Sequence, residues 1–191
     1  LSAGASWREA ALLRTLCAYR SQTGKDPSRA VQMSALASHA NIARLLLDLF
    51  AARFDPALDN TLDERTARTE QLYQDILGAL GAVEALDEDR ALRRVADLIT
   101  SVQRTNFYHT TKPATAPAGF IAIKIASEEI EHLPDPKPYR EIFTSSPRID
   151  GVHCRFGPIA RGGLRWSDRR DDFRTEVLGL VKAQQVKNAV I

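Results

Sequence analysis

Apolar side chains in the first hundred residues recur at three- and four-residue steps, the spacing of an α-helix with one buried face. In the first such segment they are Leu12, Leu13, Leu16 and Tyr19. Ser6 and Glu9 precede this run with the spacing of a capping box, in which two side chains satisfy free amides of the first helical turn. Gly24 and Pro27 lie in the polar stretch that interrupts the pattern. The pattern predicts a first helix that follows Ser6 and ends near residue 22.

Four more segments repeat the helical pattern before residue 105. They lie at about 28–38, 41–54, 62–86 and 88–103. Gly78 and Gly81 weaken the third of these segments, because glycine loses more backbone entropy in a helix than other residues do. We therefore predict that residues 1–105 form a helical domain, built as an antiparallel array.

After residue 105 the pattern changes to short apolar runs separated by proline-containing stretches, which favours β-strands joined by loops. Segment 120–125 is rich in β-branched residues, and segment 141–144 follows a group of three prolines. In segment 150–156 apolar and polar side chains alternate, as in a strand with one buried face. A single helix is predicted from Asp172 onward. Strands followed by one helix indicate a piece of an α/β or α+β domain, so the predicted fold class of the chain is mixed α+β.

Composition and charge narrow the possible classes of function. Hydrophobic residues make up 44% and charged residues 26% of the 191 residues, which suits a globular protein with a buried core. With 26 basic and 24 acidic residues the net charge is +2, so charge gives no argument for a nucleic-acid or membrane partner. Cys17 and Cys154 lie far apart without metal-ligand spacing, and both are expected to be reduced thiols in a cytoplasmic protein.

Patterns for membrane insertion, secretion and metal binding are missing from the sequence. No apolar run reaches the length needed to span a bilayer, and the N-terminus lacks the sections of a signal peptide. The chain starts at Leu1 without Met and stops at Ile191 inside an apolar run, so we expect it to be an excised piece of a longer protein. No metal site is expected, because four histidines are scattered without acidic partners at motif spacing: His39, His109, His132 and His153.

The third predicted strand leads into residues 157–170, whose composition suits an anion site. Gly162 and Gly163 let backbone amides approach a ligand closely, and Arg161 and Arg165 can each donate paired hydrogen bonds to a carboxylate or phosphate. A strained surface turn with solvated charges has the same composition. The residue types alone leave both interpretations open.

The helix after this segment carries a lysine on its apolar face. At about 100° per residue, Phe173, Val177 and Leu180 share one stripe, and Lys187 falls on it. Lys182 projects to the opposite side, and the other charged residues of the helix are also expected in solvent. A lysine on an apolar face loses hydration, which an anionic ligand or an acidic partner must offset. A bound anion and a structural ion pair with an unseen carboxylate both satisfy this requirement.

The segment from Gly157 to Arg165, Gly-Pro-Ile-Ala-Arg-Gly-Gly-Leu-Arg, is similar to the G-P-x-x-K-G-G-L/I-R segment of dehydrogenases acting on glutamate, leucine, phenylalanine and valine. The longer stretch 151–189 resembles the large NAD-specific glutamate dehydrogenases of bacteria, in which the catalytic region is embedded in a very long chain. Segments 104–107 and 7–54 also resemble this class, more loosely. The resemblance thus covers most of the chain.

Carried over position by position, the resemblance implies substrate-binding roles for five residues. Lys187 matches the lysine that binds the substrate α-carboxylate. Arg161 stands where compact relatives have a lysine for the side-chain carboxylate, and an arginine there replaces a point charge by a planar fork. Gly162 and Gly163 match the glycines of close approach, and Arg165 matches an arginine for which a structural role is open.

The resemblance also implies what lies outside this chain. The family's catalytic lysine and aspartate are absent, as is a Gly-x-Gly-x-x-Gly after a strand, so no catalytic residue and no complete Rossmann domain are expected here. NAD would bind to a domain absent from the chain, and L-glutamate and 2-oxoglutarate are the expected partners. We expect 106–191 to be the N-terminal part of an α/β substrate-binding domain, truncated at its C-terminal end and inactive alone, within a homo-oligomeric parent enzyme.

A competing interpretation is a non-catalytic helical interaction or regulatory module whose Gly-Arg turn is incidental. Under it, one apolar cluster would form a protein-docking face instead of an internal core. The cluster comprises Leu45, Leu46, Leu49 and Phe50. Extending the sequence past Ile191 distinguishes the two interpretations. A glycine-rich segment with a lysine would favour the dehydrogenase, and a stop codon or a charged linker would favour the module.

Overall fold

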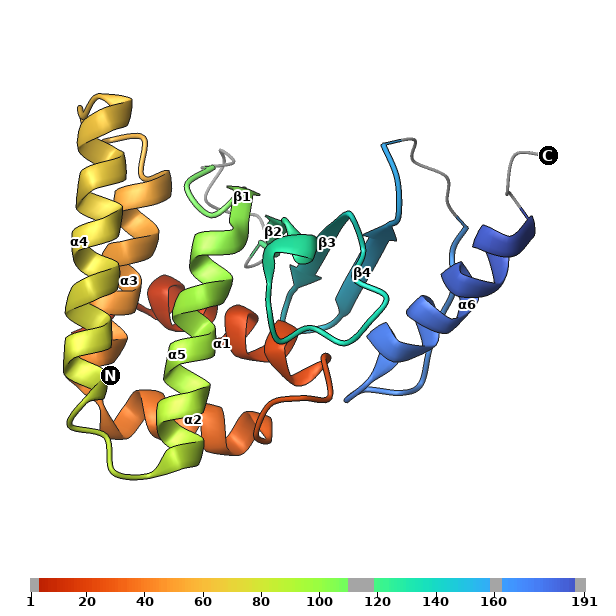
Figure 1. Ribbon diagram of the computed structural model, residues 1–191, viewed down its shortest axis with the longest axis horizontal. Helices are drawn as coiled ribbons and strands as arrows, with labels where there is room; N and C mark the ends of the chain where they lie inside the picture. The colour runs from red at the N-terminus through yellow and green to blue at the C-terminus, as the bar shows by residue number, and fades with distance from the viewer. Residues whose placement is uncertain (1–3, 110–118, 159–162, 188–191) are drawn as a thin grey trace.

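The computed structural model describes residues 4–109, 119–158 and 163–187, the side chains of 184–187 excepted. Within these ranges the chain forms six α-helices, one short 3₁₀-helix and one four-stranded antiparallel sheet. Figure 1 shows the long helices at one end of the molecule, the sheet in the middle and the last helix at the other end. The mixed α+β fold class predicted from the sequence is confirmed.

Five helices build the N-terminal array. They are α1 Trp7–Ser21, α2 Arg29–Ser38, α3 Ala40–Phe54, α4 Leu62–Leu80 and α5 Leu86–Ser101. The predicted capping box at Ser6 and Glu9 is present at the start of α1. Helix α4 ends at Leu80, earlier than predicted, because the amide of Gly81 bonds to the carbonyl of Gly78, 3.2 Å away, in a tighter turn. The chain therefore leaves the helix at the weak point that its glycines create.

The apolar cluster of α3 faces the interior. Leu46, Leu49 and Phe50 have no measurable exposure, and Leu45 packs against the same core while partly buried. Figure 1 shows α3 running beside α4, with α5 next to them. This burial makes the cluster part of the intramolecular core, and no docking face remains there.

The sheet contains strands β1 Val102–Thr105, β2 Ile121–Ile125, β3 Arg140–Ser145 and β4 Asp150–Arg155, paired in chain order. Strand β1 was not predicted, and the helix expected to reach residue 103 ends at Ser101. Val102 is fully buried and continues the helical spacing of the residues before it, so the hydrophobic periodicity does not show that the helix ends and a strand begins. Pairing of Val102 with Ile125 sets the strand instead.

The segment Thr105–Asn106–Phe107 includes the end of β1 and the two residues after it. The Asn106 side chain accepts a hydrogen bond from the amide of Ala122 (2.7 Å) and donates to the carbonyl of Phe120 (3.0 Å). Phe107 is buried and packs edge-on against Phe50 of α3, with ring centroids 5.7 Å apart. The segment therefore joins the sheet to the helices.

Helices and sheet share one hydrophobic core. Ile123 and Ile125 of β2 and Phe143 of β3 are fully buried in the same cluster as the inward faces of α1, α3 and α5. The Tyr19 ring of α1 meets Phe143 edge-on at 5.6 Å between centroids. Packing is thus continuous across residue 105, and a domain boundary at that position stays a proposal.

Helix α6, Phe173–Lys187, packs beside β4. Its buried face agrees with the predicted one only in part: Phe173 packs partly buried against the core as predicted, whereas Leu180 is 45% exposed. Arg174 and Leu178 are the buried residues of the helix. The expectation that the remaining charged residues of this helix lie in solvent was wrong for Arg174, whose partner is a carboxylate of the sheet. Lys182 is exposed, as predicted.

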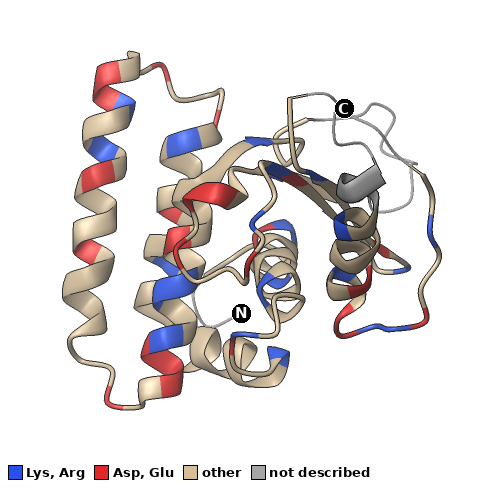
Figure 2. Ribbon diagram, turned by 45° about the vertical axis from the view of Figure 1, so that its right-hand side comes forward, with Lys and Arg blue, Asp and Glu red and all other residues tan. Residues whose placement is uncertain are grey.

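Both cysteines are free and buried. Burial raises the pKa of the Cys17 thiol to about 12. Figure 2 shows positions of basic and acidic residues interspersed along the ribbon of α5. Within the described ranges no single helix has the length and hydropathy to cross a membrane, and the α2–α3 pair, which passes this test together, is bent by 101°.

Candidate functional site

The predicted site residues lie in the segment before α6 and at the end of that helix. Arg161 and Gly162 fall outside the described residues. Lys187 is the last residue of α6, and its side chain is not among those described. Gly163 and Arg165 are described in the connection between β4 and α6. A Cβ at Gly163 would meet no described heavy atom within 4 Å, so packing here gives no reason for glycine at this position.

Arg165 ties this connection to the first turn of α6. Its Nε lies 2.8 Å from Glu176 Oε1, and the Ser167 hydroxyl donates to Glu176 Oε2 at 2.6 Å. The Ser167 hydrogen bond and then Arg165 hold the pKa of Glu176 below its usual range. A carboxylate in the first helical turn also interacts favourably with the helix dipole. These contacts support a structural role for Arg165.

The rest of the connection is open to solvent. Leu164 is fully exposed and Trp166 is 74% exposed. Arg169 pairs with Asp172 just before α6, and this hydrogen-bonded pair lowers the pKa of Asp172. The connection is therefore held by polar contacts at its C-terminal end and has no apolar cover in the described structure.

A buried ion pair anchors the other face of α6, and sequence reasoning missed it. Arg174 donates from Nε to Glu141 Oε2 (2.7 Å) and from Nη2 to Glu141 Oε1 (2.6 Å), a bidentate geometry. The side chains are 1% and 0% exposed. Burial acts to lower the pKa of Arg174, but the hydrogen bonds and charge of Glu141 outweigh it, and the net shift is upward. Arg174 therefore stays charged.

Two further groups contact the same carboxylate. The hydroxyl of Tyr19 in α1 donates to Glu141 Oε1 at 3.2 Å, and the Cys154 thiol of β4 lies 3.8 Å from Oε2. Burial, followed by the charge of Glu141, raises the pKa of both Tyr19 and Cys154. The one available signal in the sequence was Glu141 itself, a charged residue on the same strand face as the buried Phe143.

A second contact joins α1 to the start of α6. Gln22 caps α1 and is buried. Its side-chain amide donates to the carbonyl of Arg170 at 2.7 Å, and its Oε1 accepts from the amide of Arg174 at 3.2 Å. One side chain of the helical array thus satisfies backbone groups on both sides of the first residue of α6.

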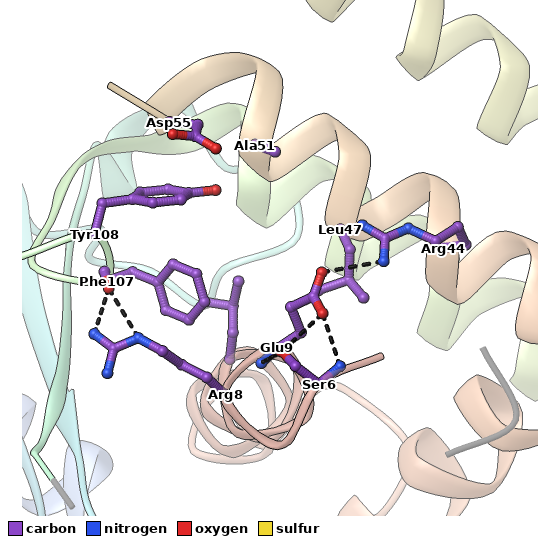
Figure 3. A pocket seen from close by; sticks show the side chains of 10 residues that line it. Ser6, Arg8, Glu9, Arg44, Leu47, Ala51, Asp55, Phe107 and Tyr108 are labelled. Atoms are coloured by element: carbon purple, nitrogen blue, oxygen red, sulfur yellow. Dashed lines mark hydrogen bonds and ion pairs between the residues drawn. The ribbon is translucent and has the colours of Figure 1, made fainter. Parts of the chain in front are cut away.

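A separate depression of about 420 Å³ lies between α1, α3 and the turn at Phe107 and Tyr108. Figure 3 shows Arg8 donating two hydrogen bonds to the Phe107 carbonyl, and Glu9 bridging Ser6 and Arg44. Gly163 and Arg165, the two predicted site residues that the structure describes in full, do not line it. Four of its polar side chains, those of Ser6, Arg8, Glu9 and Arg44, are engaged in these contacts, which is the arrangement of a structural contact.

The described residues include no group of three His, Cys, Asp or Glu side chains placed to hold a metal ion. His39, which has no acidic partner at motif spacing in the sequence, is half-buried, and its Nε2 lies 2.9 Å from Glu88 Oε2 at the start of α5. This contact joins the turn between α2 and α3 to the first turn of α5.

Comparison with known proteins matches both parts of the chain to protein families. Residues 75–191 match the model of the bacterial NAD-glutamate dehydrogenase catalytic domain, and residues 1–56 match glutamate dehydrogenase helical motif 3. The chain is 50% identical to the NAD-specific glutamate dehydrogenase of Pseudomonas aeruginosa and 45% identical to that of Mycobacterium tuberculosis, over 191 residues in each case. It is 46% identical to that of Halomonas elongata over 193 residues.

All residues of the chain align with each relative, and the chain spans 12% of the relative's length. The catalytic-domain match includes the sheet, the connection with Gly163 and Arg165, and α6 with its Arg174 anchor. The chain belongs to the bacterial NAD-glutamate dehydrogenase family.

Proposed function

We propose that the chain is part of an NAD-dependent glutamate dehydrogenase that oxidatively deaminates L-glutamate to 2-oxoglutarate and ammonia. The observation that carries this proposal is 45–50% identity over the whole chain to enzymes named NAD-specific glutamate dehydrogenase. NAD binds to a domain outside this chain, so the chain alone is inactive. The full enzyme is a cytoplasmic homo-oligomer in this proposal.

Within the enzyme, residues 1–105 act as a helical support and residues 106–191 supply one part of the glutamate-carboxylate site. Lys187 binds the α-carboxylate, and Arg161 meets the side-chain carboxylate with its planar fork. The backbone at Gly162 and Gly163 approaches the substrate closely, and Arg165 holds the connection onto Glu176.

The chemistry expected of these residues is binding and orientation. When bound, NAD accepts hydride from the glutamate α-carbon. Cationic side chains fix both carboxylates of the substrate, which makes the reacting carbon approach the nicotinamide in one orientation. The site favours an extended dicarboxylate over an apolar amino acid, because an apolar side chain offers Arg161 no anion with which to form hydrogen bonds.

Two lysines of α6 provide a matched test of the site in the full-length enzyme. Lys187→Ala removes a charge-assisted bond to a desolvated anion, a loss of about 2–4 kcal/mol in transition-state stabilisation. We expect kcat/KM for glutamate to fall roughly 30- to 1000-fold. Lys182 is exposed, and Lys182→Ala should stay near wild type because exposed charges contribute about 0–1 kcal/mol.

Steady-state kinetics and melting temperature are measured on both variants. A Lys187→Ala enzyme with normal glutamate kinetics would refute the site assignment. A large fall in melting temperature, with activity lost only in proportion to folded protein, would instead identify Lys187 as part of a structural ion pair. Equal or better turnover of leucine, valine or phenylalanine, or a strict requirement for NADP, would refute the substrate and cofactor.

A further inference from the structure

We propose that Tyr19 and Gln22, at the C-terminal end of α1, position α6 for glutamate binding; this rests on the proposed function of Lys187. We call these two residues, with the Glu141–Arg174 pair, the α1 clamp. Their contacts give the helical array a specific task in the enzyme. None of the four residues was singled out by the sequence as a functional residue.

The first part of the clamp fixes the N-terminal end of α6 along the chain. Gln22 contacts the carbonyl of Arg170 and the amide of Arg174 through opposite ends of one planar side-chain amide. Because both contacts are to the backbone, they define where the helix begins and do not depend on the side chains of residues 170–174. Gln22 is buried, so water does not compete freely for these bonds.

The second part fixes the tilt and rotation of α6. The two parallel hydrogen bonds between Arg174 and Glu141 set the orientation of the guanidinium relative to β3. The Tyr19 hydroxyl bonds to the same carboxylate, and its ring lies near the guanidinium, 5.9 Å from ring centroid to Arg174 Cζ. Helix α1, strand β3 and helix α6 therefore meet at one carboxylate.

Physical considerations favour positioning over stability as the role of this pair. A buried ion pair gains little net stability, because desolvation offsets most of the attraction between the charges. The Nη1 atom of Arg174 is buried without a hydrogen-bond partner among the described atoms, which adds to the free-energy cost of burying the pair. The two parallel hydrogen bonds between Arg174 and Glu141 nevertheless fix the relative orientation of the two side chains.

The distance along α6 from Arg174 to Lys187 makes the orientation of the helix at the clamp important for the position of Lys187. Thirteen residues separate Arg174 from Lys187, which is about 20 Å at 1.5 Å per residue. A tilt of about 3° at the clamp would displace the backbone at Lys187 by roughly 1 Å. Displacements of this size can cost about 100-fold in rate when they move a substrate-positioning group.

The test uses full-length enzyme and removes the clamp without leaving a buried charge. In the double variant Glu141→Gln/Arg174→Met both charges disappear, so folding should be retained. In Gln22→Met the shape of the side chain is kept and its two hydrogen bonds to α6 are lost. We expect each to raise the KM for glutamate roughly tenfold or more while the KM for NAD and the melting temperature change little. Arg93→Gln, which removes the half-exposed pair with Asp89 on α5, is the control and should behave as wild type.

Lys187→Ala is measured in the same series to separate the two proposals. Unchanged glutamate KM in both clamp variants, alongside an impaired Lys187→Ala, overturns the positioning role alone. A parallel rise in the KM for glutamate and NAD overturns it too, because that pattern indicates general loss of structure. An unimpaired Lys187→Ala overturns the proposed function and the clamp with it. If the double variant does not fold, Gln22→Met alone decides, by the same criteria.

Discussion

At the residue scale, a second buried carboxylate holds the loop between α1 and α2. The Asp26 side chain is 1% exposed, and its Oδ2 lies 2.7 Å from Arg20 Nε while its Oδ1 lies 2.6 Å from Arg94 Nη1. The Thr23 hydroxyl donates to Oδ2 at 3.1 Å. The two arginines belong to α1 and α5, so one loop residue connects two helices of the array.

This arrangement predicts an asymmetric response to mutation. Asp26→Asn leaves the buried Arg20 guanidinium without an anionic partner, and we expect a loss of about 3–5 kcal/mol in the free energy of unfolding. Asp89→Asn, which removes the partner of Arg93 at a half-exposed site on α5, should cost about 0–1 kcal/mol. Urea unfolding of both variants measures the difference. Equal losses would show that Asp26 is not a buried anchor.

At the scale of elements, periodicity predicted what depends on local sequence. The capping box fixed the start of α1, and the glycines at 78 and 81 marked the place where α4 ends. Strand β1 was not predicted because Val102 fits both a helical and a strand pattern, and only its pairing with Ile125 makes it part of a strand. Element type is therefore predictable where the local pattern and the tertiary partner agree.

The candidate site was predictable in a different way. The roles of Arg161, Gly162 and Lys187 came from resemblance, and they stay predictions because these groups lie outside the described side chains. The anchor at Arg174 could not be predicted, because its partner Glu141 is 33 residues away and the contact exists only after β3 and α6 pack together. Burying an arginine also contradicts the rule that charged helix positions face solvent.

The start of α4 offers a test of one element. Thr61 and Glu64 form a capping box, with the Thr61 hydroxyl accepting from the Glu64 amide at 3.3 Å. Thr61→Ala should lower the free energy of unfolding by about 1 kcal/mol, whereas Thr66→Ala, an exposed position one turn later, should change it by less than about 0.5 kcal/mol. A loss that is the same at both positions would exclude a specific capping effect.

The capping box also implies a pH dependence. The backbone hydrogen bond from Thr61 lowers the pKa of Glu64 below its ordinary 4.5. A lowered carboxyl pKa means that the contribution of Glu64 is complete above that ordinary value and is lost as the pH falls through the lowered one. In wild type the free energy of unfolding should therefore decline over this acidic range more steeply than in Glu64→Gln, as urea titrations at pH 3 to 6 would measure.

At the scale of the whole molecule, the continuous core implies that helices and sheet unfold together. Phe143 of β3 is fully buried, and its ring packs near the rings of Tyr19 in α1 and Phe173 in α6. The ring centroids are 5.6 Å and 6.5 Å away, respectively. Phe143 thus lies where the array, the sheet and the last helix meet. Ile142, its neighbour on the opposite face of the strand, is 37% exposed.

Phe143→Ala should lower the free energy of unfolding by about 3–5 kcal/mol, because a large ring is removed from a core that cannot fully collapse around the cavity. If folding is cooperative, hydrogen-exchange protection should fall by the same free energy in α3, in β2 and in α1. Ile142→Ala should cost much less and serves as the control. Retained protection in α3 alongside loss in β2 would mean that the helical array is an independent folding unit, and the division at residue 105 would then be a boundary in folding as well as in sequence pattern.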